Sequence, residues 1–202
     1  MSTVLSLEDV GQLAPAGYFI ALRIGFAFPM EEVNALPPAW VEHYTRQRYM
    51  LFDPVVRWAY AHTGVVHWND LSGDDPKGIL DRAREHGLHH GITISVFDGN
   101  AEGQRSFGSF SRSDRPFIDM EIKLLEAFVH RRHREMAPPT NLTEAELSAL
   151  RMVKEGMRLK QIAFELDVTE GAVKQRLKNA KGKLGAKTST QAATMAAQYG
   201  II

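Results

Sequence analysis

The sequence predicts an α+β domain, an antiparallel sheet with helices on both faces, followed by an all-α domain of four helices that includes a helix-turn-helix. Segments rich in β-branched and aromatic residues, typical of strands, occur only before residue 137. Two prolines in APPTN, residues 137–141, end a long helical segment, and only helical spacing follows them. We therefore expect a first domain at 1–136, a linker at 137–141 and a second domain at 142–202.

Four segments of the first domain are predicted to be strands: 17–26, 63–68, 91–97 and 104–112. The sequence DGN, residues 98–100, joins the last two as a hairpin turn. Helical spacing is found in three further segments: 39–51, 77–87 and 117–136. The last of these is amphipathic, and its apolar face is expected to contain Met120, Leu124, Leu125 and Phe128.

The second domain shows helix start and stop signals at regular intervals. Thr143 and Glu146 form a capping box, and Gly156 ends that helix. Residues 158–167 form a short second helix, the third runs from the Thr169 cap to Gly185, and a fourth spans 189–200. The tight turn between the second and third helices predicts a helix-turn-helix.

Composition excludes several classes of protein. With 44% apolar and 24% charged residues and no cysteine, the chain is an ordinary globular protein without disulfides or thiolate metal sites. The N-terminus lacks a basic n-region, and no apolar run is long enough to cross a membrane, so a cytoplasmic protein is expected. The histidines at 89–90 and 130–133 have no acidic or cysteine ligand beside them, and no nucleophile elbow is present, so neither a metal nor a catalytic residue is predicted.

The charge is unevenly distributed. Residues 1–139 carry 14 Lys and Arg against 18 Asp and Glu, whereas residues 140–202 carry 10 against 6. A basic C-terminal third suggests a polyanionic partner, although a solvated helical face would give the same charge.

The helix 169–184 gives the clearest indication of DNA binding. Lys174 and Lys178 are one turn apart near its N-terminal half, where a recognition helix meets base edges in the major groove. Other basic residues are better placed to contact phosphates: Arg176, Lys181, Lys183 and Lys187. A surface helix commonly carries lysines, but five basic residues and no acid between 173 and 184, within a helix-turn-helix, favour DNA binding.

The segment from 141 to 193 resembles the LuxR-type helix-turn-helix along its whole length. The matching positions are Glu146, Leu150, Gly156, the pair Val173-Lys174 and the run Lys183 to Gly185. This resemblance adds Thr169 to the expected DNA-binding residues. Asp167 stands where that family usually has a glycine, Ala172 replaces a hydroxyl residue, and Arg176 replaces a frequent histidine.

The first domain resembles the acyl-homoserine-lactone receptors of the same family. Those proteins carry a Trp, a Tyr four residues later, an Asp-Pro nine beyond that, and a second Trp fifteen after the Asp. Here these positions are Trp40, Tyr44, Asp53-Pro54 and Trp68. Gly91 matches a glycine that follows in the family pattern, although the interval from Trp68 is several residues short.

The resemblance implies a ligand site whose chemistry suits an acyl-homoserine lactone. The Trp40 indole can donate to the lactone carbonyl, Asp53 can accept from the amide N–H, and the Tyr44 hydroxyl can donate to the amide carbonyl. Trp68 would form an aromatic wall, and Ser109 aligns with a hydroxyl residue that often binds the ligand. Taken singly, each aromatic is more often a core residue and an Asp before Pro is usually a turn former.

Such a regulator has no cofactor other than its signal ligand, an N-acyl-homoserine lactone. Its implied partners are a double-stranded DNA operator, a second copy of the chain in a homodimer, and RNA polymerase, with no membrane. The 117–136 helix is expected to contribute to the dimer interface. Leu36 and Val41 replace polar residues found in some receptors, which favours an unsubstituted or longer acyl chain.

Three alternatives remain open from the residues. The same fold could respond to a non-lactone signal or act without a ligand. A small-molecule enzyme could carry a fused DNA-binding tail, although no pair of base and nucleophile is evident. A protein-interaction module would predict no salt-dependent DNA binding by residues 140–202.

Overall fold

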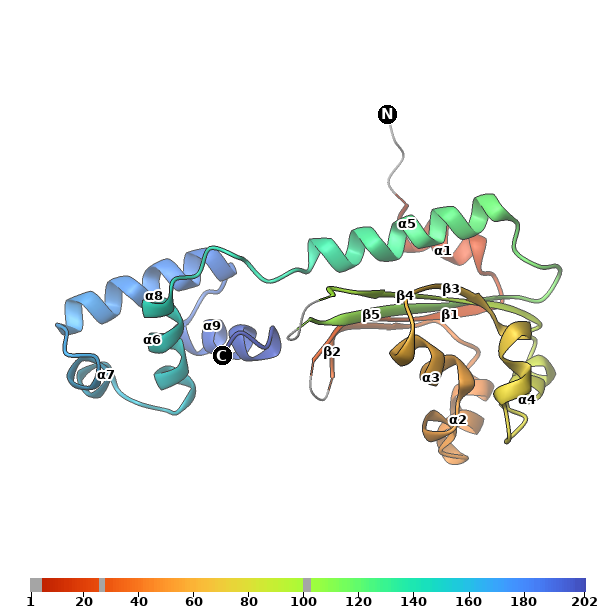
Figure 1. Cartoon of the computed structure of the whole chain (residues 1–202), viewed down its shortest axis with the longest axis horizontal. Coiled ribbons are helices and arrows are strands. Elements are labelled where there is room, and N and C mark those ends of the chain that lie inside the picture. The colour runs from red at the N-terminus through yellow and green to blue at the C-terminus, as the bar shows by residue number, and fades with distance from the viewer. Residues whose placement is uncertain (1–4, 26–27, 100–102) are drawn as a thin grey trace. The chain divides into compact units, whose positions relative to one another are not determined.

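The computed structural model describes residues 5–25, 28–99 and 103–202. It divides into two compact units, Met1–Met136 and Ala137–Ile202 (Figure 1). The first unit contains an antiparallel sheet, and the second is helical in its described structure. Both features agree with the predicted fold class.

The sheet has five strands in the order β2-β1-β5-β4-β3, and all its pairs are antiparallel. The strands are β1 Gly17–Ile24, β2 Pro29–Asn34, β3 Gly64–His67, β4 His90–Phe97 and β5 Arg105–Arg112. Four were predicted from β-branched and aromatic content. Strand β2 was missed, because PMEEVN is a half-exposed edge strand without the apolar alternation that marks a buried one. Asn100 of the predicted hairpin turn lies outside the described residues.

Helices α1 Leu7–Leu13 and α5 Asp119–Glu135 cover one face of the sheet (Figure 1). Leu125 and Phe128 of α5 are buried in the core cluster between this helix and the strands, as expected from the amphipathic pattern. Met120 and Leu124 are instead 63% and 36% exposed. The predicted apolar face therefore included two residues too many. The side chains that α5 buries are Leu125, Phe128 and Val129, whereas Met120 and Leu124 point outward.

The opposite face is covered by α2 Pro38–Arg46, α3 Pro54–Ala61 and α4 Ile79–Glu85 (Figure 1). Short 3-10 segments at Tyr49–Leu51 and Trp68–Asp74 join this layer. Helix α3 was not predicted, since Asp53-Pro54 suggested only a turn. The structure shows that Asp53 is the N-cap of α3 and that Pro54 occupies its first turn, where a missing N–H is harmless.

The second unit contains α6 Glu144–Lys154, α7 Leu159–Glu165, α8 Glu170–Leu184 and α9 Ser189–Gln198. The Thr143–Glu146 capping box is present at the start of α6, as predicted. Asp167, in the turn between α7 and α8, has φ of 48° and so occupies the left-handed conformation that glycine adopts more readily. Leu150, Ile162 and Val173 are fully buried and join α6, α7 and α8.

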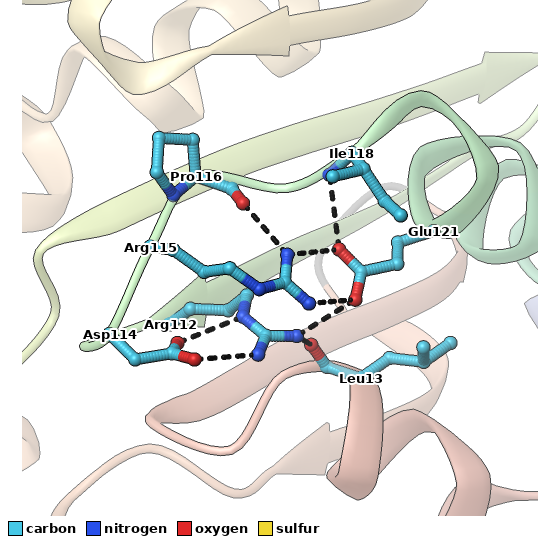
Figure 2. Close-up of polar contacts among 7 residues, drawn as sticks. All are labelled: Leu13, Arg112, Asp114, Arg115, Pro116, Ile118 and Glu121. Atoms are coloured by element: carbon cyan, nitrogen blue, oxygen red, sulfur yellow. Dashed lines mark hydrogen bonds and ion pairs between the residues drawn. The ribbon is translucent and has the colours of Figure 1, made fainter.

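An ion-pair cluster centred on the largely buried Arg112 and Glu121 fixes the start of α5 to the end of β5 (Figure 2). The Arg112 guanidinium donates to Glu121 at 3.0 Å, to Asp114 at 2.9 and 3.0 Å, and to the Leu13 carbonyl at 3.1 Å. Arg115 donates to both oxygens of Glu121, at 2.8 and 2.9 Å. The Arg115 guanidinium holds the pKa of Glu121 below its ordinary value. The cluster thereby connects α1, β5 and α5.

We expect Glu121→Gln to lower the free energy of unfolding of the first unit by about 3 kcal/mol, because it leaves the buried Arg112 without its deepest anionic partner. Glu135→Gln on the same helix is the matched control. Its carboxylate pairs with two arginines but is 43% exposed, so a loss of about 0–1 kcal/mol is expected. Denaturation followed by tryptophan fluorescence reports this unit specifically, because Trp40, Trp58 and Trp68 all lie in it. Equal losses in the two variants would contradict the role given to the cluster.

Candidate functional sites

A cavity of about 460 Å³ lies between the sheet and the helices α2, α3 and α4. Its polar lining includes the residues named from the sequence, Trp40, Tyr44, Asp53, Trp68 and Ser109. The structure therefore brings all five together from four separate parts of the chain: α2, the cap of α3, the segment after β3, and β5.

Asp53 is the polar centre of the cavity wall and is only 7% exposed. Its Oδ1 accepts from the Val55 backbone N–H at 2.8 Å, which caps α3. Its Oδ2 accepts from the Tyr44 hydroxyl, also at 2.8 Å. Burial raises the pKa of Asp53, and burial together with the nearby Asp53 charge raises the pKa of Tyr44. Tyr44 is thus protonated and donates its single hydroxyl hydrogen to Asp53.

Trp68, Thr93 and Ser109 form a hydrogen-bonded chain across the sheet. The Trp68 indole N–H donates to the Thr93 hydroxyl at 3.1 Å, and the Thr93 and Ser109 hydroxyl oxygens are 3.3 Å apart. Because the Thr93 oxygen already accepts from the indole, its own hydrogen can be directed to Ser109. The Ser109 hydroxyl hydrogen is then left for an acceptor in the cavity, which Ser109 lines.

Gly91 makes room for Trp68. A Cβ atom built on Gly91 would lie 1.9 Å from Cδ2 of the Trp68 ring, far inside van der Waals contact. Gly91 does not have a positive φ, so the glycine is required by close packing rather than by backbone conformation. The spacing between Trp68 and Gly91 in the sequence thus corresponds to a direct contact.

Trp40 is 5% exposed and lies in an aromatic cluster on α2. Its ring is 5.5 Å from that of Tyr44 and 6.2 Å from that of Tyr49. Within the described part of the chain, its indole N–H has no hydrogen-bond partner, and Trp40 lines the cavity. A donor of this kind, largely removed from water, is complementary to a ligand carbonyl.

The remainder of the cavity is mainly apolar. Its lining includes Phe19, Ala21 and Ile24 of β1, Val56 and Tyr60 of α3, and Phe107 of β5. The Phe107 ring lies 5.8 Å from Phe19 and 6.3 Å from Tyr60, so this part is walled by aromatic rings. Leu36 and Val41, noted in the sequence for their lack of polarity, also line the cavity.

Sequence reasoning missed several members of this site. Thr93 could have been found, because it lies two residues after Gly91 and so shares its face of the strand. Glu32 and Asn34 also line the cavity. They belong to the edge strand β2, which itself escaped prediction, so no local signal identified them.

In the second unit, α8 presents the basic residues singled out from the sequence. Lys174 and Lys178 are exposed one turn apart, and Arg176 and Lys181 are half-buried at its flanks. Thr169 is exposed, and its hydroxyl accepts from the Ala172 N–H at 3.1 Å as the N-cap. The described structure therefore gives Thr169 a helix-capping role in addition to any contact with DNA.

Two features of α8 were not anticipated. Lys183, expected to contact phosphate, donates instead to both oxygens of the buried Glu146, at 2.8 and 3.0 Å, and to the Asn141 carbonyl at 2.7 Å. Its role is structural, and it explains why Glu146 and Lys183 belong to one sequence signature. Gln175 and Asn179 are exposed between the basic flanks and hydrogen-bonded to each other at 2.8 Å.

Two searches of the described residues were negative. No group of three or more His, Asp or Glu side chains in these ranges could hold a metal ion. No helix among them is long and apolar enough to cross a membrane.

Comparison with known proteins gives matches over both units. The family model of the autoinducer binding domain matches residues 29–136, and the model of the bacterial regulatory proteins of the luxR family matches residues 140–196. The regulatory protein SdiA of Escherichia coli is 29% identical over 177 residues, which cover 82% of this chain and 74% of SdiA. The quorum-sensing regulator RhlR of Pseudomonas aeruginosa is 29% identical over 199 residues, covering 92% and 82%.

The same relationship appears in solved structures. A crystal structure of E. coli SdiA has a TM-score of 0.53 and 26% identity, covering 98% of this chain and 92% of that one. A structure of SdiA in complex with octanoyl-rac-glycerol has a TM-score of 0.52 and 26% identity, covering 96% and 85%. Most of the cavity lining and the helix-turn-helix lie within the residues that the two models match. The chain belongs to the LuxR family of bacterial regulators that join an autoinducer-binding domain to a DNA-binding domain.

Proposed function

We propose that this regulator senses an N-acyl-homoserine lactone and binds a DNA operator as a homodimer. The observation that carries the choice of ligand is the presence of a buried acceptor, Asp53, and of the indole donor of Trp40 in the lining of one cavity. A lactone head group offers an amide N–H to the first and a ring carbonyl to the second. A ligand carbonyl that is left without a donor in the cavity costs about 1–3 kcal/mol, and the Asp53 carboxylate can accept one more hydrogen bond beside those from Tyr44 and Val55, so both residues select for this head group.

The third polar contact is assigned to Ser109 in this proposal. The resemblance suggested that Tyr44 donates to the amide carbonyl, but its hydroxyl hydrogen is directed to Asp53 at 2.8 Å. Ser109 has a hydrogen available because Thr93 can donate to its oxygen. Tyr44 then orients the carboxylate, while Trp68 forms the wall beside the lactone ring.

The apolar part of the cavity suits the acyl chain. Leu36 and Val41 offer no hydrogen bond to a substituent on that chain, which supports an unsubstituted acyl group. Asn34 and Glu32 are polar but belong to the exposed edge of the site, where water competes for them.

The competing ligand class is an acyl glycerol. The related SdiA was solved with octanoyl-rac-glycerol, whose hydroxyls could also donate to an aspartate. It lacks an amide N–H and a ring carbonyl, so the Trp40 donor and the Asp53 acceptor would meet a flexible diol instead of a rigid head group. We favour the lactone because the two protein groups are held in fixed positions by α2 and by the cap of α3.

For DNA, the proposal is that Lys174, Gln175 and Lys178 meet base edges in the major groove while Arg176 and Lys181 contact phosphates. Asn179 would support Gln175, to which it is bonded. Thr169 begins the helix and lies at the surface beside them. Residues 137–141 would serve as the linker between the two functions.

Exposed apolar residues on the outer surface of α5 favour the proposal of a dimer. Met120 and Leu124 are exposed one turn apart, and Ile118 just before the helix is 56% exposed. A second copy that covers this apolar stripe would bring two recognition helices into one assembly, as binding to a two-fold symmetric operator requires. We further propose that the protein acts in the cytoplasm, contacts RNA polymerase when it activates transcription, and catalyses no reaction.

Lactone binding should raise the melting temperature of the full chain, measured with N-acyl-homoserine lactones of increasing chain length and with octanoyl glycerol as the comparison. Asp53→Asn should weaken the lactone response by roughly 10- to 100-fold, because a charged acceptor is replaced by a neutral one. Asp70→Asn, at an exposed aspartate of the neighbouring segment, is the control. If no lactone raises the melting temperature, or if octanoyl glycerol raises it more, the lactone proposal is wrong.

For the protein without ligand, Asp53→Asn is expected to increase stability, although it weakens ligand binding. Burial raises the pKa of Asp53, so its ionisation disfavours the folded state. This contribution is fully favourable below the pKa of the unfolded state and is lost as the pH rises through the folded-state pKa. Asp53→Asn keeps the helix cap and should therefore melt higher than the wild type at neutral pH, with the difference shrinking toward pH 4. A variant less stable at every pH would contradict this account.

Gly91→Ala should displace the Trp68 ring and weaken lactone affinity about tenfold or more, at a stability loss of about 1–3 kcal/mol. Gly73→Ala is the matched control, because a Cβ there meets no atom within 4 Å. Ligand titration and the emission spectrum of the tryptophans measure the two effects. Unchanged lactone affinity in Gly91→Ala would remove Trp68 from the proposed site.

Lys174→Ala and Lys178→Ala should each weaken binding to the preferred DNA sequence by about 1–3 kcal/mol and relax its base preference. Lys181→Ala should weaken binding to all sequences alike and reduce the salt slope by about one unit. Lys77→Ala, which removes an exposed lysine of the first unit outside α5, controls for net charge. Binding to selected and random duplexes, measured over a salt series, separates these effects, and wild-type behaviour of both α8 variants would exclude α8 as the reader.

A further inference from the structure

A buried polar network lies where α5 ends, on the face of the sheet opposite the cavity. Its members are Arg23 of β1, Ser106 of β5, His133 of α5 and Asp98 at the end of β4. Arg23, Ser106 and His133 are at most 4% exposed. None of them lines the cavity, and neither ligand binding nor DNA binding as described so far uses them.

The hydrogen bonds and the ion pair of this network form a closed ring. The Arg23 backbone N–H donates to the Ser106 hydroxyl at 2.9 Å, and Ser106 lies 2.7 Å from Nδ1 of His133. Nε2 of His133 is 3.0 Å from Asp98, which also forms an ion pair with the Arg23 guanidinium. The Arg23 Nε–H returns to the backbone carbonyl of His133 at 2.8 Å. Three strands and the last turn of α5 are thereby joined.

The proton positions follow from this arrangement. Burial lowers the pKa of His133, so the ring is neutral near pH 7 and has one donor and one acceptor nitrogen. Asp98 can only accept, so Nε2 carries the proton and Nδ1 accepts from the Ser106 hydroxyl. Each polar atom then has a partner of the correct type. This serine, histidine and aspartate resemble a hydrolytic triad, but Ser106 is fully buried among the described residues and does not line the ligand cavity, so its hydroxyl is not accessible to a substrate there.

A bulge in β1 creates the network. The register between β1 and β5 shifts between Ala21 and Ile24, and Arg23 has φ of 53°. Both Ala21 and Ile24 line the cavity, whereas Leu22 and Arg23 both face α5. Without the extra residue, alternation would direct Arg23 into the cavity. The left-handed region is unfavourable for a non-glycine residue, and the hydrogen bond of Arg23 to α5 and its ion pair with Asp98 offset that strain.

Residues of the network are also neighbours in sequence of residues that line the cavity. Ser106 precedes Phe107, which lines the cavity, and Arg23 lies between Ala21 and Ile24. A movement of either strand that accommodates a ligand must therefore move Arg23 or Ser106. At the other end, His133 lies three residues before Met136, the last residue of the first unit.

We propose that Arg23, Ser106, His133 and Asp98 are positioning residues that transmit occupancy of the cavity through the β1 bulge to the last turn of α5. The proposal rests on the proposed function in that the cavity must bind a signal. The transmission needs no new contact, because the strands that wall the cavity and the network share a backbone. Its strength should fall in the usual range of coupling between two sites, about 1–3 kcal/mol or 5- to 150-fold in affinity.

The test compares two serine variants of the full chain on the same strand. Ser106→Ala removes the hydroxyl at the centre of the network. Ser111→Ala is the matched control, because Ser111 is equally buried but its hydroxyl has no hydrogen-bond partner among the residues that the structure describes. The readouts are the dissociation constant of N-octanoyl homoserine lactone, amide hydrogen exchange of residues 130–136 with and without it, and its effect on affinity for a duplex selected by the wild type.

In the wild type and in Ser111→Ala, the lactone should change exchange at 130–136 and DNA affinity by about fivefold or more. Ser106→Ala should bind the lactone with a dissociation constant within about twofold of the wild-type value. In this variant, the lactone should change hydrogen exchange at 130–136 and DNA affinity by less than about twofold. A purely structural role would reduce stability without separating ligand affinity from response. Wild-type responses in Ser106→Ala, or no lactone effect on residues 130–136 in a wild type that binds it, would overturn the proposal.

A further arm does not depend on the ligand. Ala21→Leu adds volume to the cavity wall on β1 and should alter hydrogen exchange at 130–136 when it is the only substitution. When it is combined with Ser106→Ala, it should leave the exchange of these residues unchanged relative to Ser106→Ala alone. If the wild type binds no lactone, the proposed ligand class fails, and this arm alone decides the inference. An unaltered exchange at 130–136 in Ala21→Leu would then reject it.

Discussion

The buried carboxylate of Asp53 is the group on which the organisation of the cavity depends. One oxygen caps α3 and the other holds the Tyr44 hydroxyl of α2, so a single side chain sets the relative positions of two helices that wall the cavity. Its burial is unfavourable for a charge, as the raised pKa shows. In the proposed complex, a ligand amide N–H would add a hydrogen bond to a carboxylate that already carries this cost, which would link the selectivity of the site to its stability.

Charged groups inside both units are stabilised by the same principle of complete pairing. In the first unit, Arg112 and Glu121 satisfy each other and fix the start of α5. In the second, Lys183 neutralises the buried Glu146 and ties α8 to the start of α6. Pairing and hydrogen bonding together offset the cost of burying these two carboxylates, and the Lys183 ammonium that takes part in such a pair is unavailable to DNA. The basic surface of α8 is therefore narrower than its composition suggests.

The two faces of the sheet give its strands two functions. Residues that alternate along β1 and β5 line the cavity on one side and pack against α5 on the other. The bulge at Arg23 departs from this alternation and directs an arginine to the end of α5. Because a sheet packed on both faces cannot shift one face alone, a change in the cavity and a change at α5 are mechanically related.

The sequence by itself determined the features that local rules control. Capping residues, helical periodicity and β-branched runs located most of the helices and four strands. The resemblance to the acyl-homoserine-lactone receptors grouped Trp40, Tyr44, Asp53 and Trp68 as one site. Tertiary structure alone decided what depends on neighbours distant in the chain. It showed that Tyr44 donates to Asp53, that Thr93 links Trp68 to Ser109, that Lys183 pairs with Glu146, and that Met120 faces outward. A side chain's partner is set by the packing of separate elements, and no local pattern records it.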